Sequence, residues 1–406
     1  MAYKFIDGSV TAAKGFKASG IHCGIRKNKS KRDIALIFCD ARCTAAAVYT
    51  TNLVKSSPIT VTKKNIADGY AQAVICNSGN ANTCNADGME KAEMMCSLVA
   101  EKLPVAAEDV IVASTGVIGQ KLPIEPIAEG MEQLASELSE NGSANAAEAI
   151  MTTDTVAKEV AVETVIGGKT VRVGGISKGS GMIHPNMATM LCFVTTDAAV
   201  SAPMLQKAVS RAADLTFNMI SIDGDTSTND MLSVMASGLA GNAEITEENE
   251  DFEAFCEALT AVCRELSRMM AKDGEGATKL LICKVSGAKT EKDAKGVAKS
   301  VICSSLLKAA MFGSDANWGR VLCAIGYSGC DVDVNKVDVA FASSEGRIDV
   351  CKNGAGIDFS EETAKNILMK DEIDIIVDLN DGSGAAEAYG CDLTYEYVKI
   401  NGDYRT

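Results

Sequence analysis

The feature that most constrains the fold is an alternation of short apolar runs with segments of helical periodicity. Apolar runs of strand length, bounded by turn residues, predict strands at 34–39, 45–50, 71–77, 111–113, 190–195, 220–222, 279–285, 373–379 and 391–400. Apolar residues recur at helical spacing in 88–101, where Asp87 is the predicted cap, and we also expect helices at 124–138, 144–151, 202–213, 247–270 and 293–307.

Tight turns, rather than helices, join several of the predicted strands. Gly167 and Gly168 separate the runs 160–165 and 170–173, which predicts a hairpin, and a glycine-rich loop is expected at 174–181. Frequent hairpins argue against a regular doubly wound sheet. The sequence therefore predicts an α+β fold in which mixed sheets are layered with helices.

Composition narrows the class of protein. With 406 residues, 47% hydrophobic and 23% charged, the chain is long enough for two to three globular units, and a boundary near 274–276 is expected where glycines follow a long helix. The net charge of −15 and the absence of a basic stripe beyond 27–32 argue against nucleic-acid binding. Since no apolar run approaches the roughly 20 residues of a membrane helix and no secretory signal is visible, we expect a cytoplasmic protein.

The fifteen cysteines are scattered and contain no CxxC pair. With only His22 and His184 as imidazole ligands, no spacing supports a zinc or iron–sulfur site, so no metal is predicted. Most of the cysteines lie in apolar segments, where free thiols behave as small hydrophobes. We interpret them as reduced core residues of a reducing compartment.

Glycine-rich and acidic loops resemble ligand sites only superficially. The segment 167–170 lacks the leading glycine of a phosphate-binding loop, and 179–184 and 382–387 lack the last glycine of a dinucleotide motif, so all three are interpreted as turns. The loop 223–230 lacks the glycine and glutamate of a calcium loop, and we expect a structured turn that lines a pocket. His22 and His184 are interpreted as surface residues rather than members of a catalytic triad.

The sharpest candidate is the pair Ala188 and Thr189, which stands between a glycine-rich loop and an apolar strand. A threonine at this place can attack the preceding carbonyl, accept the acyl group on its oxygen and release a chain that begins with itself. The freed α-amino group has a reference pKa of about 7.7–8.0 and can serve as the base for its own hydroxyl, without a histidine. Taken alone, Ala-Thr before a strand is weak evidence, since β-branched threonine favours strands.

At this point the sequence resembles the ornithine acetyltransferase family, the bifunctional glutamate N-acetyltransferases of arginine biosynthesis. The resemblance covers essentially the whole chain. Eight segments carry it in the family's order: 15–29 (GFKASGIHCGIRKNK), 77–85 (NSGNANTCN), 114–119 (STGVIG), 178–191 (KGSGMIHPNMATML), 223–230 (DGDTSTND), 272–279 (KDGEGATK), 313–320 (GSDANWGR) and 391–406 (CDLTYEYVKINGDYRT).

The resemblance implies roles for single residues. Thr189 matches the nucleophile, and Ala188 the last residue of an α chain, 1–188, that is cut from a β chain, 189–406. Thr115 and Gly116 match the pair that stabilises the oxyanion through a hydroxyl and a backbone N–H. The matched substrate-binding residues are Thr153, Lys178, Thr189, Glu275, Asn401 and Thr406. Lys178 suits the α-carboxylate and Glu275 a cationic amine; without the family match both would be interpreted as a solvated loop lysine and a helix-end carboxylate.

The implied reaction is a two-step acetyl transfer in a self-cleaving, N-terminal-nucleophile-like architecture. Thr189 takes acetyl from N2-acetylornithine, ornithine leaves, and glutamate accepts the acetyl group; no cofactor is required. Some members also use acetyl-CoA, and the residues leave that open here. The implied assembly is an α2β2 heterotetramer. Two alternatives remain: an amidase or aminopeptidase on a related self-cleaving scaffold, and a non-catalytic protein that binds amino acids.

Overall fold

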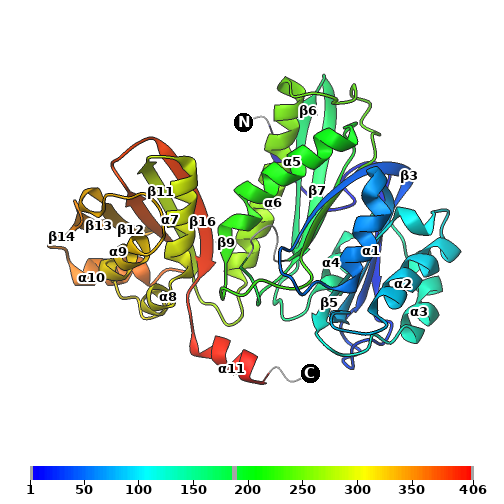
Figure 1. The fold of residues 1–406 in the computed structure, drawn as a ribbon, viewed down its shortest axis with the longest axis horizontal. Coiled ribbons are helices and arrows are strands. Elements are labelled where there is room, and N and C mark those ends of the chain that lie inside the picture. Colours follow the sequence, from blue (N-terminus) through cyan, green and yellow to red (C-terminus); the bar gives the residue numbers. More distant parts are fainter. Residues whose placement is uncertain (1–2, 185–189, 404–406) are drawn as a thin grey trace. The chain divides into compact units, whose positions relative to one another are not determined.

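The computed structural model describes residues 3–184 and 190–403 (Figure 1). These residues form two compact units. Unit 1 contains the described residues 3–179, 190–218 and 226–266, and unit 2 contains 180–184, 219–225 and 267–403. Each unit has its own sheet, and both sheets mix parallel and antiparallel pairs. The predicted α+β class is confirmed.

In the described part of unit 1 the sheet has nine strands in the order β1-β6-β7-β8-β10-β3-β4-β5, with β2 paired to β3. Their bounds are β1 Tyr3–Ile6, β2 Phe16–Ile21, β3 Ile34–Tyr49, β4 Tyr70–Asn80, β5 Val110–Val117, β6 Lys158–Ile166, β7 Lys169–Lys178, β8 Leu191–Thr196 and β10 Met231–Ala236. The predicted hairpin is confirmed, because β6 and β7 pair antiparallel on either side of Gly167 and Gly168.

Helices cover this sheet on both faces, which explains its continuous apolar strands. In β3, Leu36 and Phe38 belong to a core shared with α2 and α3, whereas Ile37 and Cys39 belong to a second core shared with α4. Alternate side chains of a strand point to opposite faces, so a strand buried on both faces needs apolar residues at every position. The helices of unit 1 are α1 Ser57–Asn65, α2 Gly88–Lys102, α3 Glu125–Ser136, α4 Ser143–Ile150, α5 Ala202–Leu215 and most of α6 Glu250–Lys272, with short 3-10 turns at Ile66–Asp68 and Ala107–Asp109.

Unit 2 carries the second sheet, with seven strands in its described residues in the order β14-β13-β12-β15-β11-β16-β9. Their bounds are β9 Ile220–Ser221, β11 Leu280–Ala288, β12 Asp338–Ser343, β13 Gly346–Lys352, β14 Ala355–Gly356, β15 Glu372–Asp378 and β16 Gly384–Cys391. The helices are α7 Glu291–Cys303, α8 Ser305–Phe312, α9 Trp318–Gly326, α10 Glu361–Leu368 and α11 Tyr395–Asp403, with 3-10 turns at Phe217–Met219, on the border of the units, and Val334–Lys336.

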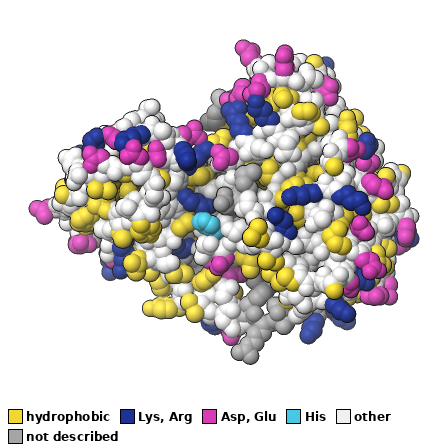
Figure 2. All heavy atoms as spheres, viewed as in Figure 1, with side chains coloured by type: hydrophobic (Ala, Val, Ile, Leu, Met, Phe, Trp, Pro, Cys, Tyr) yellow, Lys and Arg dark blue, Asp and Glu magenta, His cyan; other side chains and the backbone are white. Residues whose placement is uncertain are grey.

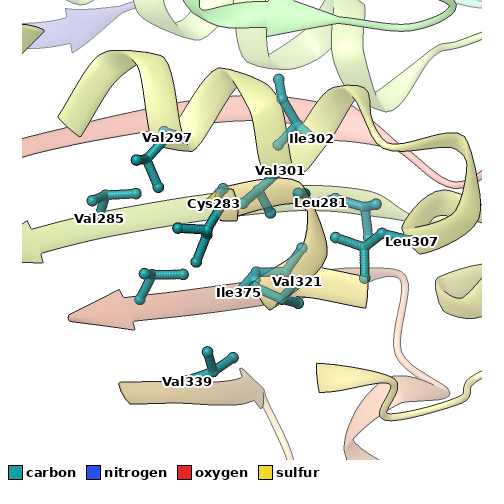
Figure 3. Packing of buried hydrophobic residues seen from close by; sticks show 14 of the residues in the cluster. Leu281, Cys283, Val285, Val297, Val301, Ile302, Leu307, Val321, Val339 and Ile375 are labelled. Carbon is teal, nitrogen blue, oxygen red and sulfur yellow. The ribbon is translucent and has the colours of Figure 1, made fainter. Parts of the chain in front are cut away.

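The core of unit 2 lies between α7 and the sheet. Helix α7 runs along β11 and β16 (Figure 1). Figure 3 shows Val297 and Val301 of α7 pointing toward Leu281 and Cys283 of β11, with Ile375 of β15 in the same cluster. All five side chains are fully buried. This apolar layer stabilises the unit that carries Glu275 and Asn401.

The structure corrects several predicted elements. The runs 34–39 and 45–50 are one strand, β3, whose pairing with β4 is interrupted by a bulge between Phe38 and Cys43. The polar residues between the two runs suggested a turn, but they lie at exposed or half-exposed positions of the same strand, where Asp40 pairs with Lys17 and Arg42 with Asp109.

Four further predictions are wrong in a boundary, an element type or a helix cap. The helix expected at 293–307 breaks at Ser304, whose hydroxyl caps α8 by accepting the N–H of Leu307. The loop expected at 174–181 is strand β7 as far as Lys178. The strand expected at 391–400 is mostly α11, because the Thr394 hydroxyl accepts the N–H of Tyr397 at 3.3 Å and starts a helix despite the β-favouring side chains. Asp87 precedes α2 but makes no side-chain cap.

On the face drawn in Figure 2, Lys and Arg side chains are interspersed with Asp and Glu. A search of the described residues finds no helix that is both long and apolar enough to cross a membrane.

Candidate functional site

Thr115 and Gly116 lie near the end of strand β5, beside β4. The sequence analysis predicted a strand at 111–113, but β5 continues to Val117, and Gly116 pairs with Gly79 of β4. Thr115 is 9% exposed. The structure therefore holds both residues in a sheet rather than in a loop, which gives a hydroxyl and a peptide N–H a rigid support.

Gly116 has a backbone conformation that other residues rarely adopt, with φ at 133°. A Cβ added there would lie 2.5 Å from the nitrogen of Asn80 and 2.8 Å from Cα of Gly79. Gly79 itself has φ at 98°. Two glycines that face each other across β4 and β5 let the strands approach closely while their peptide planes turn, which only glycine permits without strain.

A buried asparagine, which the sequence analysis did not single out, fixes the same end of β5. Asn229 donates from Nδ2 to the carbonyl oxygens of Ser114, at 2.7 Å, and Ala81, at 2.6 Å. Its Oδ1 accepts the hydroxyls of Thr83 and Thr228. Asn229 thus ties the turn expected at 223–230 to the backbone of β5 at Ser114. Its sequence signal was the density of short polar residues that bond backbone groups.

Asp230, the next residue, is a buried carboxyl group. Burial raises the pKa of Asp230 well above its usual range, although Ser227 and Lys178 oppose the shift. Its Oδ2 has no hydrogen-bond partner within the described residues. Strand β10 begins directly after it, where the N–H of Met231 donates to the carbonyl oxygen of Met190 at 2.7 Å. Met190 follows Thr189 in the sequence.

Lys178 is not the solvated loop lysine that its sequence context suggested. It ends strand β7 and is 8% exposed, with its Nζ 4.0 Å from Oδ2 of Asp154. Burial lowers the pKa of Lys178, and the Asp154 carboxylate partly offsets this. A second lysine, Lys158 of β6, is fully buried, and its Nζ lies 2.7 Å from Oδ1 of Asp154.

Asp154 lies next to the predicted substrate residue Thr153. Burial disfavours the charged form of Asp154, but Lys178 and Lys158 outweigh it and hold the pKa of the carboxyl group below its usual range. Thr153 is half-buried in the bend between α4 and β6. The carboxylate of Asp154, the residue after Thr153, therefore lies beside Lys178. The sequence analysis did not identify Asp154 and Lys158. Their opposite charges, four positions apart, were the signal that could have indicated an ion pair.

In unit 2, Glu275 and Asn401 are neighbours. The Nδ2 of Asn401, in α11, donates to Oε2 of Glu275 at 2.8 Å. Glu275 lies after α6, where its N–H donates to the carbonyl oxygen of Ser180 at 2.8 Å. A Cβ on Gly181 would lie 2.6 Å from Oε1 of Glu275, so the glycine leaves room for the carboxylate. Glu275 is thus more than a helix-end carboxylate.

Three predicted site residues, Ala188, Thr189 and Thr406, lie outside the described residues. Of the others, Thr115, Gly116, Thr153 and Lys178 belong to unit 1, and Glu275 and Asn401 to unit 2.

Both histidines are half-buried. Nδ1 of His184 lies 3.0 Å from the Ser221 hydroxyl, and burial lowers the pKa of His184 to about 4. Nδ1 of His22 lies 2.9 Å from the Lys31 carbonyl oxygen and 3.2 Å from the Asp33 carboxylate. Nδ1 of His184 also lies 3.5 Å from Sγ of Cys303.

All fifteen cysteines are free thiols, and ten are buried, which agrees with their interpretation as core residues. Among the described residues, no three His, Cys, Asp or Glu side chains are grouped so that they could hold a metal ion.

Comparison with known proteins identifies the class of enzyme. The ArgJ family model matches residues 17–406. A relative from Caldanaerobacter subterraneus subsp. tengcongensis, named "Arginine biosynthesis bifunctional protein ArgJ", is 50% identical over 99% of this chain and 100% of its own. A relative of the same name from Symbiobacterium thermophilum is 50% identical over 99% of this chain and 100% of its own. These matches confirm the predicted class, an acyltransferase.

A solved structure agrees with this assignment. The arginine biosynthesis bifunctional protein argJ from Bacillus halodurans is 48% identical, with a TM-score of 0.50, over 52% of this chain and 98% of the solved chain. The chain described here belongs to the ArgJ family.

Proposed function

We propose that the enzyme moves an acetyl group from N2-acetylornithine to glutamate through an acetyl ester on Thr189, giving ornithine and N-acetylglutamate. The observation that carries the proposal is the half-buried to buried pair Thr115–Gly116, held rigidly at the end of β5 in a chain of the ArgJ family. A rigid hydroxyl and N–H suit an oxyanion better than mobile groups do, because they need no reorganisation during the reaction.

The nucleophile is produced by cleavage between Ala188 and Thr189. In support, the solved relative from Bacillus halodurans is a chain that matches only 52% of this one although 98% of it is covered. Residues 189–406 make up a similar share of this chain. Cleavage frees the α-amine of Thr189, and an amine with a pKa near 8 can accept the proton of the Thr189 hydroxyl.

In the first half-reaction, Oγ of Thr189 attacks the acetyl carbonyl carbon, and the hydroxyl proton passes to the Thr189 amine. The hydroxyl of Thr115 and the N–H of Gly116 stabilise the resulting oxyanion. The bond from the acetyl carbon to the ornithine nitrogen then breaks, and the Thr189 amine returns the proton to that nitrogen. In the second half-reaction the amine of glutamate attacks the carbonyl carbon of the ester and gives up a proton to the Thr189 amine. The bond from that carbon to Oγ of Thr189 then breaks, and the Thr189 amine passes the proton to Oγ.

The substrate roles follow from charge. Lys178, a buried ammonium, suits an α-carboxylate, and a bound anion would offset the cost of its burial. The carboxylate of Glu275, oriented by Asn401, suits the side-chain ammonium of ornithine. Thr153, next to Asp154, and Thr406 complete the proposed set of substrate residues.

The relatives are named bifunctional, and we extend the proposal to acetyl-CoA as a second donor for glutamate. The same ester on Thr189 would form from either donor. We also propose an α2β2 heterotetramer. The free thiols favour a reducing compartment, the cytoplasm, as its location.

Intact-mass spectrometry tests the nucleophile directly. The wild-type protein is expected as two fragments, one ending at Ala188 and one beginning at Thr189, and Thr189→Ala as one uncut, inactive chain. Incubation with acetyl donor alone should add one acetyl group to the fragment that begins at Thr189. A fully active chain that remains uncut would contradict the mechanism.

Product analysis separates the proposal from the amidase or aminopeptidase alternative, which the family match does not favour. With N2-acetylornithine as donor, added glutamate should turn the product from acetate into N-acetylglutamate. A hydrolase would release acetate at the same rate with or without glutamate.

A further inference from the structure

A single buried carboxylate joins the two segments that carry Thr153 and Lys178. Oδ1 of Asp154 accepts the backbone N–H of Gly179 at 2.7 Å, directly after Lys178. Oδ2 of Asp154 accepts the backbone N–H of Thr152 at 2.9 Å, directly before Thr153. Asp154 therefore holds the backbone directly after Lys178 and directly before Thr153, and its side chain is completely buried.

The charges around Asp154 are not balanced. Lys158, at 2.7 Å, is a direct partner of the carboxylate, whereas Lys178, at 4.0 Å, lies beyond hydrogen-bond distance. Burial favours the neutral form of Asp230, the other carboxyl group that acts on Lys178. Two ammonium groups thus share one buried carboxylate, which leaves one positive charge without a full partner.

The unmatched charge is that of Lys178. Within the described residues, the structure gives Nζ of Lys178 no hydrogen bond, although the residue is only 8% exposed. Buried ammonium groups are costly unless they are paired and hydrogen-bonded. Because Nζ of Lys178 lies near the Asp154 carboxylate without a hydrogen bond to it, Lys178 can bind a second anion.

We propose that Asp154 is a positioning residue that, with Lys158 as its permanent counter-ion, holds Lys178 and the Thr153 bend ready for a substrate carboxylate. This inference rests on the proposed function, because it takes Lys178 as the group that binds the α-carboxylate. Because Lys158 is the direct ion-pair partner of Asp154, Asp154 favours the charged form of Lys178 without accepting a hydrogen bond from Nζ of Lys178. The N–H groups of Nζ therefore stay available for a substrate carboxylate. Without Lys158, Asp154 would draw Lys178 into a direct ion pair.

The test compares N2-acetylornithine with its α-carboxamide, which lacks the negative charge. The variant Asp154→Asn/Lys158→Met removes both charges of the buried pair, so the net charge of the cluster formed with Lys178 stays the same. Its preference for the carboxylate substrate should fall about tenfold or more, through KM rather than kcat, the order expected for a weakened charged hydrogen bond. The variant removes Asp154, which raises the pKa of Lys178, together with Lys158, which lowers it by less. The pKa of Lys178 should therefore fall, and the rise of KM at high pH should begin at a lower pH.

Lys158→Met alone provides a second route, in which Asp154 and Lys178 remain as a neutral pair that the fold can bury. It too should lose preference for the carboxylate. Asp197→Asn is the matched control: Asp197 is fully buried and accepts two backbone N–H groups, from Lys14 and Arg172, as Asp154 does. The control should keep the wild-type preference. Self-cleavage, followed by intact mass, reports whether each variant folds.

Two outcomes would overturn different statements. If Lys178→Met abolishes the preference while Asp154→Asn/Lys158→Met and Lys158→Met both retain it with an unchanged pH profile, Asp154 is not a positioning residue. If Lys178→Met itself retains the preference, the substrate role of Lys178 in the proposed function is wrong.

Discussion

Replacing Gly116 by alanine tests the proposed oxyanion site at its backbone. At a φ of 133° an L-residue is strained by about 1–3 kcal/mol. The new Cβ would also lie 2.3 Å from the carbonyl carbon of Gly79, whereas non-bonded carbon contacts are relaxed at about 3.5 Å or more, so β5 must move by about 1 Å. The atom is opposed by backbone of β4, which cannot rotate away as a side chain would.

A displacement of this size should reduce acetyl transfer strongly. Misplacement by about 1 Å can cost about 10²-fold in rate, and loss of one oxyanion donor about 10²–10³-fold. We therefore expect kcat of Gly116→Ala to fall by about 10²-fold or more while KM for N2-acetylornithine changes little. The measurement is steady-state formation of N-acetylglutamate by protein whose fragments have been verified by mass spectrometry.

Gly119→Ala is the matched control. Gly119 follows in the same segment with φ at 78°, but nothing lies within 4 Å of its added Cβ. It carries the backbone strain, about 1–2 kcal/mol, without the collision with β4. It should lower Tm slightly and leave kcat near the wild-type value. If Gly116→Ala shows wild-type kcat, or if Gly119→Ala loses as much activity, the backbone at Gly116 is not part of the oxyanion site.

Three further predictions concern unit 2. Glu275→Gln keeps an oxygen for Asn401 but removes the charge, so KM for N2-acetylornithine should rise about 10–100-fold while KM for acetyl-CoA, which lacks the ornithine ammonium, stays unchanged; an equal rise for both donors would refute the role. Ile375→Ala removes a fully buried side chain from the core in Figure 3 and should lower the free energy of unfolding by about 2–5 kcal/mol in urea denaturation, and an effect below 1 kcal/mol would contradict that packing. Burial lowers the pKa of His184 to about 4 from a usual 6.5, so the unfolded chain binds the proton more readily than the folded chain. Stability should therefore decline as the pH falls from 6.5 toward 4. His184→Asn should flatten this part of the profile of Tm against pH, and an unchanged profile would exclude His184 as its cause.

The sequence predicts the strands of this fold best where packing and local preference agree. Residues 71–77 are apolar at nearly every position, and the strand they form, β4, is buried on both faces. Prediction of secondary structure fails where a contact with a residue distant in the sequence determines the conformation. The segment after Cys391 is rich in tyrosine, valine and isoleucine, which favour strands, yet Thr394, anchored by donating its hydroxyl to the carbonyl oxygen of Gly276 at 2.7 Å, caps a helix.

The candidate site shows the same division. The resemblance to a family supplied Thr115, Gly116, Lys178 and Glu275 as single residues, but no local pattern indicates that Lys178 is buried. Its burial depends on Asp154, which lies 24 positions earlier in the chain and reaches Lys178 only because β6 and β7 pair as a hairpin. The hairpin turn was predicted, but the predicted strands covered only 160–165 and 170–173, so the strand ends that carry Lys158 and Lys178 were left out of it.

The glycine-rich motif after Lys178 acquires a physical meaning from these contacts. Gly179 and Gly181 suggested half of a dinucleotide-binding motif, and the missing third glycine led to their interpretation as a turn. In the structure each glycine serves a carboxylate instead. The N–H of Gly179, at a φ of 149°, donates to Asp154, and the missing side chain of Gly181 leaves room for Glu275. At both glycines a carboxylate lies close to the backbone, where a side chain would be in the way. A phosphate-binding loop uses glycine for the same reason, because its anion also approaches the backbone closely.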